Sequence, residues 1–199
     1  MFEIALNFDT RPIGTVVFDD VHARKMTRVL PSTVSLTQRS APDRERIERF
    51  IDSVYAKSYG ALIGQHYPGF ISVHGRDGSI IAAAGFRCAG DGPLYLERYL
   101  PSPMEQLLRT GAGSPVPRTQ IVEIGNLASN GRGGSLFLFV MLTAFLHRSR
   151  ITHAAVTATQ SLRRTFGAFG FEFLQLARAC PECLPDGGSS WGSYFRTDP

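Results

Sequence analysis

The spacing of hydrophobic residues in the first half of the chain predicts an amphipathic helix followed by a β-hairpin. Apolar side chains such as Ile47 and Ile51 recur at helical intervals over residues 42–59, which predicts a helix that begins at Pro42 or Asp43. Two apolar runs, Phe70–His74 and Ser79–Arg87, flank the sequence Gly-Arg-Asp-Gly. Because these turn residues separate two strand-like runs, we expect a hairpin here.

The second half of the chain alternates strand and helix patterns. The predicted order is strand Gln120–Leu127, helix Leu136–His147, strand His153–Thr157, helix Thr159–Phe169 and strand Phe171–Ala177. A short helix is expected over Pro103–Arg109 and a final edge strand over Trp191–Arg196. This alternation predicts an α/β fold with a largely open sheet.

The first 40 residues carry weaker signals, a short strand at Thr15–Phe18 and a strand or loop at Ser32–Ser40. We therefore divide the chain into an N-terminal extension of strand and loop, 1–40, which is able to join the sheet, and a domain over 41–199. Met1–Asp20 lacks the pattern of a signal peptide. Leu136–Leu146 is shorter than the roughly 20 residues of a membrane span. We expect a cytoplasmic protein without a membrane span.

Composition and charge favour a globular protein that binds an anionic small molecule. Of 199 residues, 43% are hydrophobic and 19% are charged, which is enough apolar material for a core. The net charge is +4, and the arginines are scattered rather than clustered. A diffuse positive field suits a nucleotide cofactor, although a merely basic surface fits equally well. No nucleic-acid-binding module is visible, so we expect no such partner.

Cysteine and histidine spacing gives little support for a metal site. Cys180 and Cys183 form a single C-x-x-C, which is typical of a redox pair or half a zinc site. No second pair exists, and the five histidines show no ligand spacing. We expect two reduced loop thiols and no metal. Neither H-E-x-x-H nor G-x-S-x-G occurs, which argues against a metalloprotease or serine hydrolase.

A glycine-rich loop joins the strand ending near Leu127 to the next helix. It consists of Asn130, Gly131, Arg132, Gly133, Gly134 and Ser135. Glycines let backbone N–H groups face a ligand, and the helix start adds further N–H groups and a positive dipole end. The loop is neither a Walker motif nor G-x-G-x-x-G. It fits the short loop with which GNAT-type acyltransferases bind the pyrophosphate of coenzyme A, with Arg132 as a clamp. A plain helix start with flexible glycines is the alternative.

Two acidic residues in apolar surroundings are the candidate catalytic groups. Glu123 interrupts the run Ile-Val-Glu-Ile, and Glu97 lies within Leu94–Leu100. Burial would raise the pKa of each carboxyl and suit it as a general base for an amine. The two carboxylates would then share one pocket. A structural salt bridge with Arg87 or Arg98 is the alternative.

Several further residues are candidates for substrate binding. Arg98 would bind a substrate carboxylate in a bidentate manner. Asn126 has a side chain that both donates and accepts, although Asn after Gly is also common in turns. Trp191 would line an acyl pocket or anchor the core. Arg87 and Tyr194 complete the set of substrate-binding candidates.

Several segments together resemble the thermostable-hemolysin family, from about Arg44 to the C-terminus. The segments are Leu94–Leu100, Pro103–Glu105, Ile121–Ala128, Leu162-Arg163 with Phe166, Phe169-Gly170-Phe171 and the closing Trp191-Gly-Ser-Tyr194. The resemblance implies a GNAT-like acyltransferase fold, an α/β fold with a central mixed, twisted sheet flanked by helices. It implies no particular reaction, because the family name comes from a haemolytic phenotype.

A more distant resemblance is to acyl-homoserine-lactone synthases, which share the GNAT fold. Glu123 matches a glutamate of that family, Arg87 matches an earlier arginine, and Asn126 stands where a second arginine is usual. GNAT enzymes often carry a Tyr that protonates the thiolate, and Phe166 occupies that position. Replacement acids would be Tyr194, Tyr99 or Tyr59.

The resulting hypothesis is an acyltransferase of GNAT-like type. It would move an acyl group from a thioester, acyl-CoA or acyl carrier protein, to a small-molecule amine. Backbone N–H groups between Asn126 and Ala128 would stabilise the oxyanion. One alternative is a membrane-active haemolytic protein without enzymatic activity. The other is a GNAT fold that binds an acyl ligand without catalysis.

Overall fold

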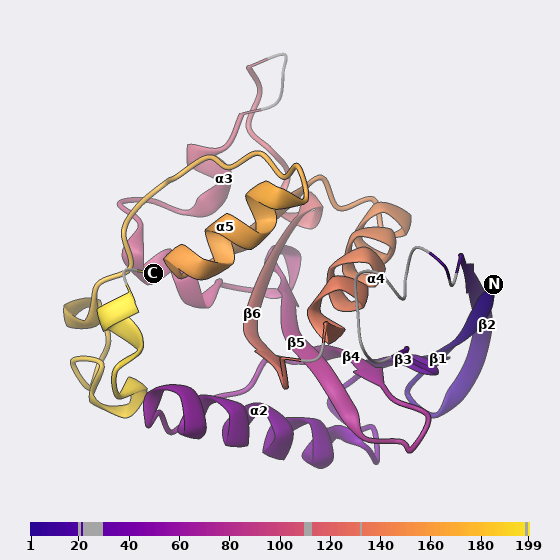
Figure 1. Cartoon of the computed structure of the whole chain (residues 1–199). Coiled ribbons are helices and arrows are strands. Elements are labelled where there is room, and N and C mark those ends of the chain that lie inside the picture. The colour runs from indigo at the N-terminus through magenta and orange to yellow at the C-terminus, as the bar shows by residue number, and fades with distance from the viewer. Residues whose placement is uncertain (20, 22–29, 110–112, 132, 198) are drawn as a thin grey trace. The chain divides into compact units, whose positions relative to one another are not determined.

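The computed structural model describes residues 1–19, 21, 30–109, 113–131, 133–197 and 199 (Figure 1). The chain forms two compact units, each assembled from several segments. Unit 1 comprises Met1–Val54, Gln65–Phe86 and Gly125–Arg150, and unit 2 comprises Tyr55–Gly64, Arg87–Ile124 and Ile151–Pro199. The boundary between the units therefore does not follow the order of the sequence.

The strands form one mixed sheet, in the order β2-β1-β3-β4-β5-β6-β7. They are β1 (Phe2–Phe8), β2 (Arg11–Phe18), β3 (Thr33–Thr37), β4 (Gly69–His74), β5 (Ile80–Cys88), β6 (Ile121–Ser129) and β7 (His153–Val156). The pairs β1–β3 and β6–β7 are parallel, and the pairs β1–β2, β3–β4 and β4–β5 are antiparallel. The predicted α/β class with a mixed sheet is confirmed.

The helices with the clearest sequence patterns form close to their predicted bounds. They are α2 (Arg44–Tyr59), α3 (Met104–Leu107), α4 (Gly134–Arg148) and α5 (Gln160–Ala168). Ile47 and Ile51 of α2 are buried, as its pattern predicts. Helix α5 begins where the Thr159 hydroxyl accepts a hydrogen bond from the Leu162 N–H. Among the described residues, no helix has the length and apolar character that crossing a bilayer requires.

Within unit 1, α2 and α4 cover opposite faces of the sheet. The Arg44 guanidinium of α2 lies 4.8 Å from the ring centre of Phe70 on β4. The Phe145 ring of α4 lies 5.2 Å from the ring of Phe86 on β5. Phe86 pairs with Gly69, the neighbour of Phe70 along β4. Because successive residues of a strand face opposite sides, the two rings and their helices lie on different faces.

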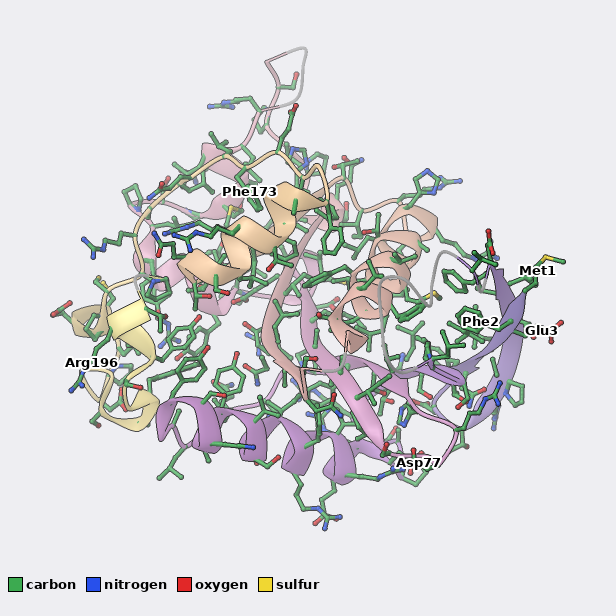
Figure 2. The ribbon with its side chains drawn as sticks, viewed as in Figure 1. Met1, Phe2, Glu3, Asp77, Phe173 and Arg196 are labelled. Atoms are coloured by element: carbon green, nitrogen blue, oxygen red, sulfur yellow. The ribbon has the colours of Figure 1, made fainter. Side chains whose placement is uncertain are left out.

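Residues 1–40 supply three of the strands of unit 1, which the sequence had only partly indicated. The ring of Phe2 on β1 stacks on Phe18 of β2, with centroids 5.5 Å apart. Phe137 of α4 meets both rings edge-on, at 5.9 and 5.5 Å. Figure 2 shows Phe2 and the neighbouring Glu3 on opposite sides of β1. The N-terminal hairpin is therefore held by the same aromatic side chain that anchors α4.

The predicted turn between β4 and β5 is confirmed. The Asp77 carboxylate, labelled in Figure 2, accepts hydrogen bonds from the Ser79 N–H at 3.0 Å and from its hydroxyl at 2.7 Å. Gly78 has φ +76°, a conformation that glycine adopts readily. Local turn chemistry thus fixes the register of this hairpin.

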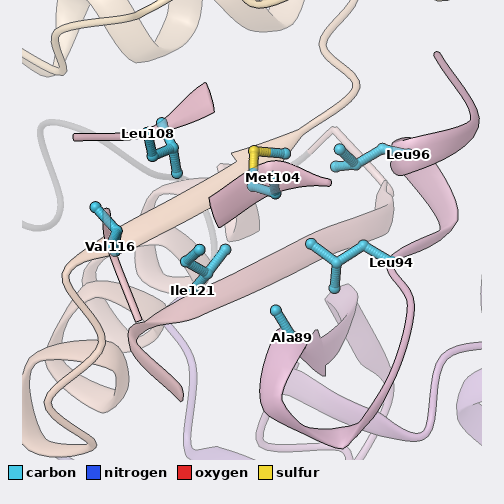
Figure 3. Close-up of a cluster of buried hydrophobic side chains, with 7 residues drawn as sticks. All are labelled: Ala89, Leu94, Leu96, Met104, Leu108, Val116 and Ile121. Carbon is cyan, nitrogen blue, oxygen red and sulfur yellow. The ribbon is translucent and has the colours of Figure 1, made fainter. Parts of the chain in front are cut away.

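Unit 2 has its own hydrophobic cluster beside the first half of β6 (Figure 3). Its members are apolar side chains from β6, α3 and the loops around them: Ala89, Leu94, Leu96, Met104, Leu108, Val116 and Ile121. Tyr99 and Leu176 pack against the cluster. Short segments far apart in sequence are therefore held by one small core.

The two C-terminal strand predictions are wrong. Over Phe171–Ala177 the backbone forms no strand. Its aromatic residues instead turn back onto α5, because the ring of Phe166 lies 5.5 Å from Phe171 and 5.7 Å from Phe173.

The segment predicted as Trp191–Arg196 forms 3₁₀ helices over Ser189–Trp191 and Tyr194–Thr197. The Asp186 carboxylate draws this segment into turns, since it accepts from the N–H groups of Gly188 and Ser190. Gly192, with φ +54°, prevents an extended continuation.

Candidate functional site

The predicted glycine loop forms a sharp passage from β6 to α4 in unit 1. Asn130 N–H donates to the carbonyl of Ile81 over 3.1 Å and ties the loop to β5. Gly131 and Gly133 have φ values of +78° and +85°, which suit glycine. Arg132, predicted as a phosphate clamp, lies outside the described residues. Gly131 and Gly133 therefore adopt backbone conformations that residues with a Cβ atom rarely adopt.

Gly134 begins α4 in close contact with the backbone of β5. A Cβ atom at this position would lie 3.0 Å from the Ile81 carbonyl oxygen and 3.3 Å from Cβ of Ala82. The helix start is thus pressed against the sheet, and the adjacent Phe137 is buried. Among the described residues, no side chain caps this helix and its first turn holds no acid. Its N–H groups and positive dipole end therefore suit an anion.

Strand β6 is irregular at Gly125 and Asn126. Asn126 is buried and has φ +49°, a left-handed conformation that Asn tolerates better than most residues. A Cβ at Gly125 would overlap the side chain of Tyr67, so glycine makes room for that ring. The paired residues of β6 and β7 end at Ile124 and Val156. The irregularity changes the direction of the Asn126 side chain, and it occurs where the pairing with β7 ends.

Unit 1 also contains an Asp–His–Asn arrangement that the sequence did not indicate. His66 Nδ1 lies 3.5 Å from Asn126 Nδ2, and His66 Nε2 lies 3.2 Å from Asp52 Oδ1. The His66 side chain is 15% exposed. The three residues come from a loop, β6 and α2, and no motif links such distant positions. A carboxylate on one ring nitrogen orients the imidazole and leaves the other nitrogen to act on a neighbouring group.

In unit 2, the carboxylate of Glu123 binds the backbone of a 3₁₀ helix over Tyr95–Tyr99. It accepts hydrogen bonds from the N–H groups of Tyr95 at 2.6 Å and Leu96 at 3.0 Å. Glu123 is only 1% exposed, so these hydrogen bonds offset the free-energy cost of burying it. The acidic residue in the apolar strand therefore caps the start of a helix.

Glu97 is the centre of an ion-pair network with Arg118. Its Oε1 accepts from Arg118 Nη1 at 2.7 Å and from Met104 N–H at 2.9 Å, and its Oε2 accepts from Leu94 N–H at 2.8 Å. Arg118 also pairs with Glu105. Burial opposes ionisation of Glu97, but the hydrogen bonds from Arg118, Met104 and Leu94 outweigh it and lower its pKa. The expectation that burial raises this pKa is therefore wrong.

Tyr95 connects several predicted site residues of unit 2. The Arg98 guanidinium lies 3.7 Å from the centre of the Tyr95 ring, and the Trp191 ring lies 6.4 Å from it. Trp191 also packs against Tyr194 at 5.2 Å. Arg98 and Trp191 thus meet at the Tyr95 ring, Glu123 binds the backbone N–H of the same residue, and Tyr194 is reached through Trp191. Arg87 instead donates to the carbonyl of Pro93.

The tyrosines expected to replace the usual GNAT acid are all weak acids here. Burial raises the pKa of Tyr59, Tyr99 and Tyr194. The Tyr194 hydroxyl donates to the Thr157 carbonyl over 3.4 Å. Each phenol is therefore protonated at neutral pH, and that of Tyr194 is already engaged.

The sequence-predicted site residues fall into two groups. Asn126, Leu127 and the described members of the glycine loop belong to unit 1, and Arg87, Glu97, Arg98, Glu123, Trp191 and Tyr194 belong to unit 2. The described residues contain no His, Cys, Asp and Glu group suited to a metal ion. Cys88, Cys180 and Cys183 are free thiols.

Comparison with known proteins gives one informative result. No curated protein sequence matches the chain. A family model described as thermostable hemolysin matches residues 37–199, which include the glycine loop, the Asp52–His66–Asn126 arrangement and the Glu97–Arg118 network. The chain therefore belongs to the thermostable hemolysin family.

Proposed function

We propose that this protein is a GNAT-like acyltransferase that moves an acyl group from acyl-CoA or an acyl carrier protein thioester to an amine. The observation that carries the proposal is the start of α4. Its glycine loop is tied to Ile81, Gly134 lies against the sheet, and no described side chain caps the helix N-terminus by a hydrogen bond. Such a site suits the diphosphate or phosphate of the donor.

His66 is the general base in this proposal. Asp52 faces His66 Nε2, which favours the tautomer with a proton there and a lone pair on Nδ1. The amine displaces the 3.5 Å contact from Asn126 Nδ2, and Nδ1 accepts its proton as the amine nitrogen attacks the thioester carbonyl and forms the C–N bond. The C–S bond then breaks, the thiolate takes a proton from solvent, and the protonated His66 returns its proton to solvent. A backbone N–H between Asn126 and Ala128 is the candidate oxyanion donor.

Glu123 is the competing choice of base, with Glu97 as a second. Both carboxylates already accept hydrogen bonds from backbone N–H groups, and the lowered pKa of Glu97 makes it a weaker base. We therefore assign them to holding the 95–99 segment. Arg87, Arg98, Asn126, Trp191 and Tyr194 are kept as proposed substrate-binding residues.

Product formation from acyl-CoA and a panel of amines, followed by mass spectrometry, tests this assignment. General-base catalysis is worth about 10²–10⁴ in rate, so His66→Gln should lower kcat by at least a hundredfold with little change in KM. Asp52→Asn should lower kcat less. The exposed His147 gives a matched control, and His147→Gln should behave as wild type. Full activity in His66→Gln with loss in Glu123→Gln would transfer the role to Glu123.

A second candidate function is membrane disruption. It is favoured by the family description and by the exposure of Phe169, Phe171, Phe173 and Leu174. Leakage of a dye from phosphatidylcholine vesicles, without any thioester, would support it. An acyltransferase without membrane activity should leave such vesicles intact.

A further inference from the structure

Unit 2 contains a cavity of about 600 Å³ that the proposed catalytic residues do not use. It lies between residues 152–158, which include β7, and residues 172–177. Leu96, Leu100 and Met104 form a further wall. Its volume falls within the range of roughly 300–1,000 Å³ that is typical of small-molecule sites.

The cavity follows a run of small side chains. Seven consecutive residues, 152–158, line it, among them Ala154 and Ala155, whose methyl groups leave the space beside them open. A volume of about 600 Å³ accommodates a hydrocarbon chain.

Most of the residues that line the cavity are apolar, and its charged lining residues are Arg109, Arg163 and Glu172. Leu174 is 70% exposed and Phe173 49% exposed, although both line the cavity. Large apolar side chains in contact with water lower the free energy when a ligand covers them. Arg109 and Arg163 line the same cavity against one carboxylate, Glu172. This charge balance favours an anionic or carbonyl head group.

We infer that this cavity binds a linear fatty acyl chain. The inference rests on the proposed function for the class of its ligand, because an acyltransferase of this type acts on acyl chains. It makes a separate prediction, however, since a free fatty acid should bind without coenzyme A, an amine or any catalytic step.

Calorimetric titration of the full chain with free fatty acids, from butanoic to hexadecanoic acid and below their micelle concentrations, tests the inference. Each buried methylene contributes about 0.8 kcal/mol, so the Kd should fall about fourfold per added methylene. The fall should stop when the cavity is full. A Kd that does not depend on chain length, or no binding, would overturn the inference.

Ala154→Phe places an aromatic ring in the cavity from an exposed position of β7, where aromatic residues are well tolerated. It should weaken binding of the longest acids at least tenfold and move the plateau to shorter chains. Ala56→Phe on exposed α2 is the matched control and should bind as wild type. Circular dichroism verifies that both variants fold. Equal binding by both variants and wild type would mean that the chains bind elsewhere.

Failure of this inference is distinguishable from failure of the proposed function. Turnover of thioesters without fatty-acid binding would contradict the fatty-acid site and support the proposed enzyme activity. Length-dependent binding that Ala154→Phe weakens, without turnover of any thioester, would support the fatty-acid site and contradict the proposed enzyme activity. A third outcome is no fatty-acid binding together with tight association with phosphatidylcholine vesicles that Ala154→Phe leaves unchanged. This outcome would indicate that the exposed apolar side chains bind a membrane surface.

Discussion

Arg118 donates through Nη1 to Oε1 of Glu97 over 2.7 Å. The same guanidinium donates to the carbonyls of Ala89 and Gly92 at 2.8 and 2.9 Å. One side chain of unit 2 therefore joins its own segment to the turn at Ala89–Gly92 and to the segment that carries Glu97. The segment bearing Tyr95 and Arg98 depends on this network for its position.

Arg118→Met should destabilise the protein by about 2–3 kcal/mol, because it leaves Glu97 partly buried without its charged donor. Chemical denaturation would measure the loss. Arg76→Met, in the exposed hairpin turn, is the control and should change the free energy of unfolding by less than about 0.5 kcal/mol. Equal effects of the two substitutions would show that the network contributes nothing.

The Glu97 network should also make stability depend on acid. The folded-state pKa of Glu97 is lowered from its ordinary value of 4.5, so the stabilisation is complete above that pH and is lost as the pH falls below it. The difference in free energy of unfolding between wild type and Glu97→Gln should therefore shrink in acid. A constant difference would contradict the lowered pKa.

His74 should give a second pH dependence in a different range. Its ring is buried, and burial lowers its pKa below the ordinary value of 6.5. Below pH 6.5 the unfolded chain takes up a proton that the folded ring resists, so stability falls as pH drops toward the folded-state pKa. Unfolding on both sides of pH 6.5 should show this fall in wild type. It should be absent in His74→Gln.

Gly134 should be the least replaceable glycine of the loop. Gly134→Ala puts a Cβ against the Ile81 carbonyl and should cost about 1–3 kcal/mol. Gly167→Ala in α5 meets nothing within 4 Å and should stabilise the protein by about 0.5–1 kcal/mol. Thermal unfolding of the pair measures both. Stabilisation by both substitutions would mean that α4 does not start against the sheet.

Ser135→Glu should discriminate between helix stability and anion binding. A carboxylate in the first turn of α4 favours the helix dipole but repels a bound diphosphate. We expect unchanged or slightly raised stability and at least tenfold weaker binding of coenzyme A. Gln160→Glu adds the same charge at the start of α5 and should leave this affinity unchanged. Equal loss in both variants would indicate only a long-range charge effect.

Much of the fold was predictable because its signals are local. Helix α2, the β4–β5 hairpin and the passage from β6 to α4 follow from hydrophobic periodicity and turn residues. The Phe171–Ala177 prediction failed because tertiary contacts with Phe166 decide its course. Periodicity carries no information on such contacts.

The candidate site was predictable only in part. The glycine loop is a contiguous signal, and the structure gives its glycines the positive φ values that explain them. Asp52, His66 and Asn126 come together only through the packing of α2, a loop and β6. The sequence predicted correctly that Glu123 is a buried acid. The backbone N–H groups that bind its carboxylate could be identified only from the folded structure.

Thermal unfolding with acyl-CoA and with the matching acyl-pantetheine, which lacks the diphosphate, tests the central claim most directly. A ligand at 100 times its Kd adds about 2.7 kcal/mol of stability. We predict that acyl-CoA raises the Tm of wild type, that acyl-pantetheine raises it much less, and that Ser135→Glu reduces the difference. No shift with any thioester, or equal shifts with and without the diphosphate, would contradict a thioester-binding acyltransferase with its phosphates at the start of α4.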